Sequence, residues 1–198
     1  PLDVKDHREK AIHCGRKMFH LLAKLNNEVM EEGLEELKIG VGINTGDVVV
    51  GNMGSDQRFD YTCLGDAVNL SSRLEGQTKE YRVGIIVGEE TTKGIEDRFN
   101  FVELDKIAVK GKKEGVRIFT ILDDTSRCAN GGDVKHHNTF LSFYRKQHWN
   151  RALKMIDLNE ITYPELKGYY EMMRERIKTL KVNRPGKGWD TIYRATSK

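Results

Sequence analysis

Apolar residues recur every three or four positions through the first part of the chain, which is the spacing of one face of an α-helix. The recurring residues are Ala11, Cys14, Met18, Leu21, Leu22, Leu25 and Val29. This pattern predicts a long amphipathic helix over 6–32, which Gly33 would end. Two runs rich in β-branched residues follow at 37–43 and 47–53, and Asn44-Thr45-Gly46 between them predicts a hairpin turn.

Helical and strand periods then alternate up to residue 122. They predict a polar loop with a short strand at 55–61, a helix at 66–77, a strand at 83–87, a helix at about 89–96, and two antiparallel strands at 101–109 and 116–122. Gly40 and Gly42 alternate with apolar residues inside the strand at 37–43, where glycine marks a close approach by a ligand or by backbone. The sum is an α+β domain with a mostly antiparallel sheet and helices packed on it.

Residues 123–136 are rich in Asp, Thr, Ser, Asn and Gly, a composition typical of a linker. Residues 137–198 are predicted to be helical, with two short helices around 148–150 and a longer one from Tyr163 to Leu180. The first two resemble a tetratricopeptide hairpin, and a single such unit cannot bury its own apolar face. We therefore divide the chain into a domain at 1–122, a linker at 123–136 and a helical extension at 137–198 that packs on the domain or on a partner.

Charge and cysteine content narrow the class of protein. The 198 residues carry a formal net charge of +3, but residues 137–198 hold 13 Lys and Arg against 6 Asp and Glu. A solvated helical face explains this excess, because no basic motif interleaved with aromatic residues accompanies it, and we expect no nucleic-acid partner. The three cysteines, Cys14, Cys63 and Cys128, match no zinc or disulfide spacing and indicate a reducing, cytoplasmic compartment. No apolar run has the length of a membrane span, and no signal peptide is visible.

One short helix carries the candidate chemistry. Asn69 and Arg73 lie four residues apart and share a helical face, while Leu70 and Leu74 mark the neighbouring face that packs inward. An arginine neutralises a phosphate oxyanion with several donors in a fixed fork, and an amide beside it can bond a sugar oxygen. Taken alone, the pair is more commonly a solvated helix face with a structural arginine.

Motifs around this helix, in a fixed order, resemble those of the class III nucleotide cyclases, the adenylate and guanylate cyclases. The motifs are Leu37 to Gly54, Arg58 to Asp66 and Gly65 to Glu75, and the resemblance covers roughly residues 1–122. It implies a ferredoxin-like, palm-type domain, here without its first strands, and a lyase that acts in signal transduction. In the implied reaction the ribose 3′-hydroxyl of ATP attacks the α-phosphate, which yields 3′,5′-cyclic AMP and pyrophosphate.

The resemblance assigns phosphate and ribose contacts by position. Arg73 would stabilise negative charge on the α-phosphate, Asn69 would orient the ribose, and Lys110 would contact the terminal phosphates. The simpler interpretation of Lys110 is a solubilising lysine in a turn, which is the one we prefer for Lys112 and Lys113.

Three further residues are expected to contact the nucleotide base. Thr62 occupies a position where the family places an adenine-binding Asp or Thr, which favours ATP over GTP, and Cys63 and Leu64 would pack beside the base. The simpler interpretations are a half-buried strand threonine and an ordinary core cysteine. The alternative functions are a guanylate cyclase and a non-catalytic module that binds nucleotide or a regulatory partner.

The resemblance also implies two Mg²⁺ or Mn²⁺ ions, a partner subunit and a longer protein. The family's metal-binding carboxylates lie before the long first helix, so we expect no metal ligand in this chain and no activity from it alone; His136-His137 in the linker would bind a metal only adventitiously. The family acts as a head-to-tail homodimer with ATP at the subunit interface. The helical extension is similar to that of bacterial cyclases with an upstream sensor and membrane spans, which predicts the cytoplasmic domain of a membrane-bound protein.

Overall fold

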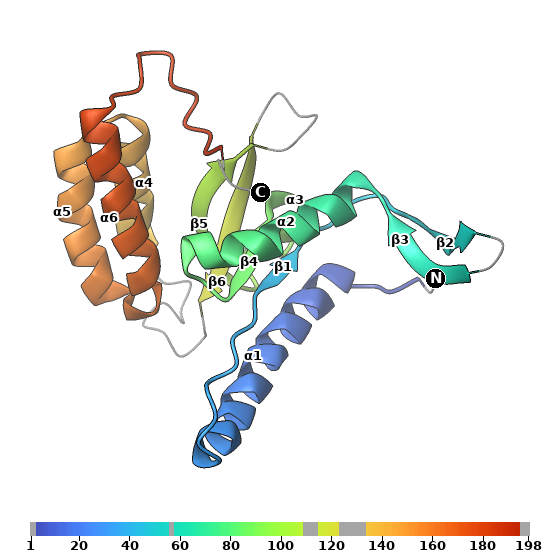
Figure 1. Ribbon diagram of the computed structural model, residues 1–198. Helices are drawn as coiled ribbons and strands as arrows, with labels where there is room; N and C mark the ends of the chain where they lie inside the picture. Colours follow the sequence, from blue (N-terminus) through green and yellow to red (C-terminus); the bar gives the residue numbers. More distant parts are fainter. Residues whose placement is uncertain (1–2, 56–57, 109–114, 123–133, 195–198) are drawn as a thin grey trace.

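The computed structural model describes residues 3–55, 58–108, 115–122 and 134–194. In chain order the elements are α1 (His7–Glu31), β1 (Val41–Ile43), β2 (Val49–Ser55), β3 (Arg58–Leu64), α2 (Asp66–Tyr81), β4 (Ile85–Gly88), α3 (Glu89–Thr92), β5 (Asn100–Ile107), β6 (Val116–Leu122), α4 (Lys135–Arg145), α5 (Trp149–Thr162), the 3₁₀ helix η1 (Pro164–Leu166) and α6 (Lys167–Val182) (Figure 1). The strand predicted at 116–122 has the observed bounds, and α3 ends four residues earlier than predicted.

Four strands form one sheet in the order β1-β4-β6-β5. β1 runs parallel to β4, and the other two pairs are antiparallel. β2 and β3 form a separate antiparallel ribbon that extends away from the sheet (Figure 1). The predicted α+β fold with a mostly antiparallel sheet is therefore confirmed.

The hairpin predicted around Asn44 is wrong, because β1 pairs with β4 and β2 pairs with β3. The residues between β1 and β2 bond to helices instead. The Asn44 side-chain amide donates to the Ala67 carbonyl (3.1 Å), and the hydroxyls of Thr45 and Thr91 are 3.0 Å apart. Because these side chains bond to α2 and α3, the segment does not form a hairpin, although its composition is typical of a turn.

Glycine allows α2 to lie directly against β1. A Cβ at Gly42 would lie 2.3 Å from the Ser71 carbonyl oxygen and 2.4 Å from the Glu75 backbone nitrogen, and a Cβ at Gly40 would lie 2.2 Å from Thr78 Oγ1. The Ser71 hydroxyl also donates to the Gly42 carbonyl (2.9 Å). Of the two alternatives that these glycines predicted, the structure contains the close approach of backbone, and this contact fixes the position of α2 on the sheet.

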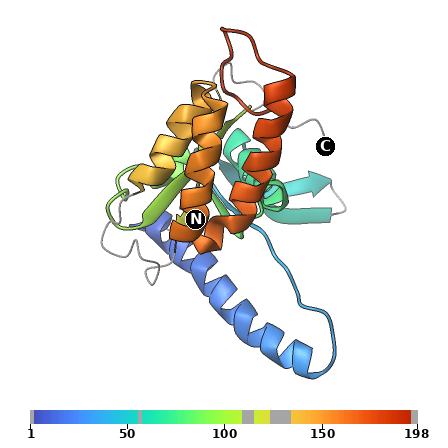
Figure 2. The same ribbon diagram turned by 90° about the vertical axis from the view of Figure 1, so that its left-hand side faces the viewer.

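The two faces of the sheet pack into two apolar cores. On the face that α2 covers, the buried strand residues include Ile86, Val102, Leu104 and Ile118. On the face that α1 covers, they include Ile43, Ile85 and Val87. Only the first half of α1 lies over the sheet, and the rest of the helix continues beyond it (Figure 2).

The helical extension packs on the same face of the sheet as α2 (Figures 1 and 2). α4, α5 and α6 bring Phe140, Ile156 and Tyr169 into the core that contains Leu74 and Leu104, and all five side chains are fully buried. The extension was expected to pack either on residues 1–122 or on a partner, and the structure shows that it packs on residues 1–122. In the described part of the chain, no helix is both long and apolar enough to cross a membrane.

The structure corrects the interpretation of His137. α4 already begins at Lys135, and the His137 ring is fully buried. A carbonyl oxygen only accepts, so Nε2 donates to the Glu103 carbonyl (2.6 Å) and Nδ1 accepts from the Tyr170 hydroxyl (2.7 Å). Burial lowers the pKa of His137 to about 4. The ring is therefore neutral at pH 7, and both nitrogens are bonded within the protein rather than available to a metal.

Acid is expected to destabilise the chain through His137. Its pKa falls from 6.5 to about 4 on folding. Below pH 6.5 the unfolded chain therefore takes up a proton that the folded chain excludes, and stability is lost as the pH falls from 6.5 towards 4. Urea unfolding should show a loss of about 2 kcal/mol between pH 7 and pH 5. His136→Gln, at the exposed neighbour, should keep this loss, and a His137→Gln variant with the same pH dependence as wild type would contradict the assignment.

Candidate active site

A single residue, Gly65, separates the end of β3 from the start of α2, and α2 presents the predicted polar pair to solvent. The backbone amides of Val68 and Asn69 donate to the Gly65 carbonyl and start the helix. Leu70 and Leu74 face the core, with 7% and 0% of their surface exposed. Asn69 and Arg73 each precede one of these leucines and are exposed together on the adjacent face. The pair is therefore neither buried nor turned into the interior.

Arg73 reaches from α2 towards the end of β5. Its Nη1 lies 3.5 Å from the Ala108 carbonyl oxygen, a contact at the long limit for a hydrogen bond. Lys110 follows two residues later and lies outside the described residues. Within the described residues, no carboxylate lies within ion-pair distance of Arg73, so its positive charge is not neutralised there. The structure thus places Arg73 beside the backbone that leads to Lys110.

The three residues expected at the base lie at the end of β3. Thr62, Cys63 and Leu64 are all exposed, and Leu64 retains 56% of its accessible surface. The simpler interpretations, a half-buried threonine and a core cysteine, are therefore wrong. Only Gly65 separates β3 from α2, so the three residues lie on one continuous segment with Asn69 and Arg73.

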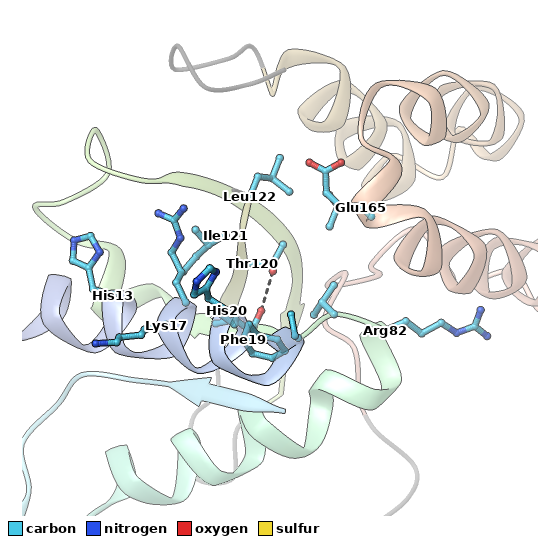
Figure 3. Close-up of a pocket in the computed structure, with 15 residues that line it drawn as sticks. His13, Lys17, Phe19, His20, Arg82, Thr120, Ile121, Leu122 and Glu165 are labelled. Atoms are coloured by element: carbon cyan, nitrogen blue, oxygen red, sulfur yellow. Dashed lines mark hydrogen bonds between the residues drawn. The ribbon is translucent and has the colours of Figure 1, made fainter. Parts of the chain in front are cut away.

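A cavity of about 1120 Å³ lies elsewhere, beside α1 and the start of η1. Its lining includes His13, Phe19, His20 and Glu165 (Figure 3) and none of the predicted site residues. Asn69 and Arg73 instead lie on open surface in a single chain. This exposure is compatible with a site that a second subunit completes.

The described residues do not fit a two-metal centre. Within residues 3–55, 58–108, 115–122 and 134–194, no three His, Cys, Asp or Glu side chains are grouped closely enough to hold an ion. We therefore assign no metal ligand to the described residues and derive no step of the chemistry through a metal.

The sequence did not reveal a buried polar cluster that connects α2 to the extension. Asp105 is 1% exposed, accepts from the Tyr81 hydroxyl at the end of α2 (2.8 Å) and pairs with the Arg176 guanidinium of α6. Burial, with the Asp105 carboxylate beside it, raises the pKa of the Tyr81 hydroxyl, which therefore stays protonated and donates. A shift in the pairing of β5 with β6 between Glu103 and Asp105 buries Asp105 next to Leu104. Because Asp105 and Arg176 are 71 residues apart, no local pattern indicates their pairing.

Comparison with known protein families identifies the class. The family described as "Adenylate and Guanylate cyclase catalytic domain" matches residues 2–123, more than half of the chain. The chain therefore belongs to the adenylate and guanylate cyclase catalytic-domain family.

Individual relatives agree with this assignment. An adenylate cyclase of Anabaena cylindrica is 36% identical over 118 residues, which are 56% of this chain and 24% of that protein. The "adenylate cyclase, terminal-differentiation specific" of Dictyostelium discoideum is 32% identical over 187 residues, which are 89% of this chain and 9% of that protein. The crystal structure of the adenylyl cyclase CyaB from P. aeruginosa matches with a TM-score of 0.54 and 34% identity over 61% of this chain and 62% of that one. The chain thus spans about a quarter or less of the length of the two sequence relatives.

Proposed function

We propose that this chain is part of the catalytic domain of an enzyme that converts ATP to 3′,5′-cyclic AMP and pyrophosphate. The observation that carries the proposal is the joint exposure of Asn69 and Arg73 on α2, with Arg73 beside the backbone that leads to Lys110. The family match over residues 2–123 and the two relatives named adenylate cyclase support it.

The reaction forms a bond between the ribose 3′-oxygen and the α-phosphorus. It breaks the bond from that phosphorus to the bridging oxygen of pyrophosphate, and the hydroxyl proton passes to solvent. Arg73 stabilises the charge that builds on the α-phosphate, and Asn69 holds a ribose oxygen so that the 3′-oxygen is in line for attack. Lys110, outside the described residues, neutralises the terminal phosphates.

The end of β3 receives the base in this proposal. The exposed Thr62 hydroxyl can donate to or accept from the adenine edge, and the exposed side chains of Cys63 and Leu64 offer a surface for the ring. The family's use of Asp or Thr at the position of Thr62 favours ATP. A hydroxyl can bond the edge of either purine, so Thr62 does not exclude GTP.

A head-to-tail homodimer is the assembly that fits this site best. Asn69 and Arg73 are open to solvent, and the metal-binding carboxylates of the family resemblance would face them from the other subunit. Mg²⁺ or Mn²⁺ is the cofactor that the resemblance implies. We infer that residues 1–198 alone form no cyclic nucleotide, since the resemblance places the metal-binding carboxylates before the long first helix. From the resemblance of the extension, we also propose that the chain is the cytoplasmic domain of a longer protein that carries a sensor and membrane spans upstream.

Turnover tests the proposed function. With ATP and Mg²⁺, the 198-residue chain is expected to form no cyclic AMP, whereas a fusion that adds the carboxylate-bearing strands of a class III cyclase before residue 1 is expected to form it. GTP in place of ATP tests the guanylate cyclase alternative. Cyclic AMP from the 198-residue chain alone would contradict its proposed inactivity. A fusion that folds and binds ATP but does not turn it over would favour a non-catalytic module.

A further inference from the structure

After α6 the chain returns to the sheet, and its last described residues lie along the edge strand β5 (Figure 1). We call residues 189–194 the C-terminal strap. The Tyr193 amide donates to the Lys106 carbonyl (2.7 Å), and the Ala108 amide donates to the Tyr193 carbonyl (2.9 Å). Tyr193 thereby forms a parallel bridge with Ile107. Two backbone hydrogen bonds thus bind the last residues of β5, immediately before the segment that contains Lys110.

The strap also contacts the other end of that segment. Ile192 is 9% exposed and lies against Gly115, where a Cβ would be only 2.9 Å from Ile192 Cγ1. Gly115 comes directly before β6. Both ends of the connection between β5 and β6 therefore contact the strap.

Side chains of the strap reach the far end of α2. The Tyr193 hydroxyl donates to Glu80 Oε1 (3.0 Å), and its ring meets the Tyr81 ring edge-on with 6.1 Å between centroids. The Arg176 guanidinium lies 3.9 Å from the centroid of the Tyr193 ring. At the start of the strap, Trp189 packs edge-on against Tyr144 with 5.4 Å between centroids. The strap is thus fixed to α2, α4 and α6 at the same time as it bonds to β5.

We propose that the C-terminal strap, chiefly through Tyr193, is a positioning device that sets the distance between α2 and the end of β5 at Ala108. This inference rests on the proposed function, in which α2 supplies Asn69 and Arg73 to the substrate. Tyr193 would act through other residues: its backbone holds Ala108, whose carbonyl faces Arg73, and its side chain holds the end of α2.

Tight control of this distance has a physical reason. Asn69 and Arg73 must both reach one triphosphate, and a misplacement of about 1 Å can lower a rate by about 100-fold. β5 is an edge strand, and without the strap the Ala108 amide would have no partner on that side among the described residues. The strap thus holds the residue whose carbonyl Arg73 contacts.

Two truncations of the full chain provide a matched test. One ends after Lys187 and removes the strap, and the control ends after Arg194 and keeps it. Hydrogen exchange of the Ala108 amide should accelerate about tenfold or more in the first and stay unchanged in the control. Equilibrium dialysis with radiolabelled ATP should show affinity weakened about fivefold or more by loss of the strap, whereas unchanged affinity with faster exchange would make the strap merely structural and overturn the proposal.

Point variants keep the test decisive if the shorter truncation fails to fold. Tyr193→Phe removes only the bond to Glu80 and should keep most of the Ala108 protection, while Tyr193→Ala also removes the ring and should lose both protection and ATP affinity. Equal behaviour of the two variants and wild type would overturn the proposal. Arg73→Ala, made with the strap intact, distinguishes failure of the proposed function from failure of the strap proposal. If this variant leaves ATP affinity and turnover of the fusion unchanged, the proposed function fails, whatever the effect of the strap on Ala108.

Discussion

Replacing Arg73 with alanine in the fusion enzyme is expected to lower kcat for cyclic AMP formation by about 100-fold or more, the scale of losing one oxyanion donor. Within the described residues, the guanidinium meets the Ala108 carbonyl and no carboxylate, so its charge is available to the substrate. Because charge on the α-phosphate grows in the transition state, kcat should fall more than KM rises. Initial rates over a range of ATP concentrations measure both constants.

Lys79→Ala is the control for Arg73. It removes another exposed positive charge from α2, six residues further along the helix and away from β3. Its kcat is expected to stay within about twofold of wild type, since exposed charges at that distance are screened by salt. A loss of less than about tenfold for Arg73→Ala, or a comparable loss for Lys79→Ala, would show that Arg73 does not act in the transition state.

Replacing Arg176 with methionine is expected to lower the free energy of unfolding by about 3–5 kcal/mol, because it leaves the buried Asp105 carboxylate without its cation. Asp105 has only 2% of its side chain exposed and Arg176 has 11%. The Tyr81 hydroxyl would remain as a donor to Asp105, but one neutral hydrogen bond does not replace the charge. Urea unfolding at pH 7 measures the change.

Lys93→Met provides the contrast for Arg176→Met. Lys93 pairs with Glu90 on the surface, where both side chains are more than half exposed, and its loss should cost less than about 1 kcal/mol. The double variant Asp105→Leu with Arg176→Met should be more stable than Arg176→Met alone, since it buries no unpaired charge. If Arg176→Met costs no more than Lys93→Met, the buried pair does not stabilise the fold.

Local sequence patterns were sufficient to predict the elements whose buried residues recur at helix or strand spacing. The leucines at 70 and 74 predicted the buried face of α2, and the alternation at 116–122 predicted β6 with its observed bounds. The hairpin at Asn44 failed because its turn-forming side chains bond to Ala67 and Thr91, partners that are remote in sequence. Strand pairing of this kind depends on contacts that composition does not encode.

For the candidate site, the sequence predicted which residues share an exposed face but not which long-range contacts surround them. The spacing of Asn69 and Arg73 predicted a shared exposed face, and the structure has it. The roles of these residues and of Thr62 and Lys110 stay predictions, because they depend on a substrate and a second subunit. Asp105 was invisible in the sequence, since a shift in strand pairing buries it and its cation comes from α6.

The apolar interior shared by α2 and the extension limits how this chain can be shortened. Phe140, Ile156 and Tyr169 fill the same core as Leu74, one residue from Arg73. Cutting the chain before residue 137 would leave the helix that bears Arg73 with its packed side in water. Such a shortened polypeptide would aggregate even within the fusion, so a loss of turnover there would report misfolding rather than a role of the extension in signalling.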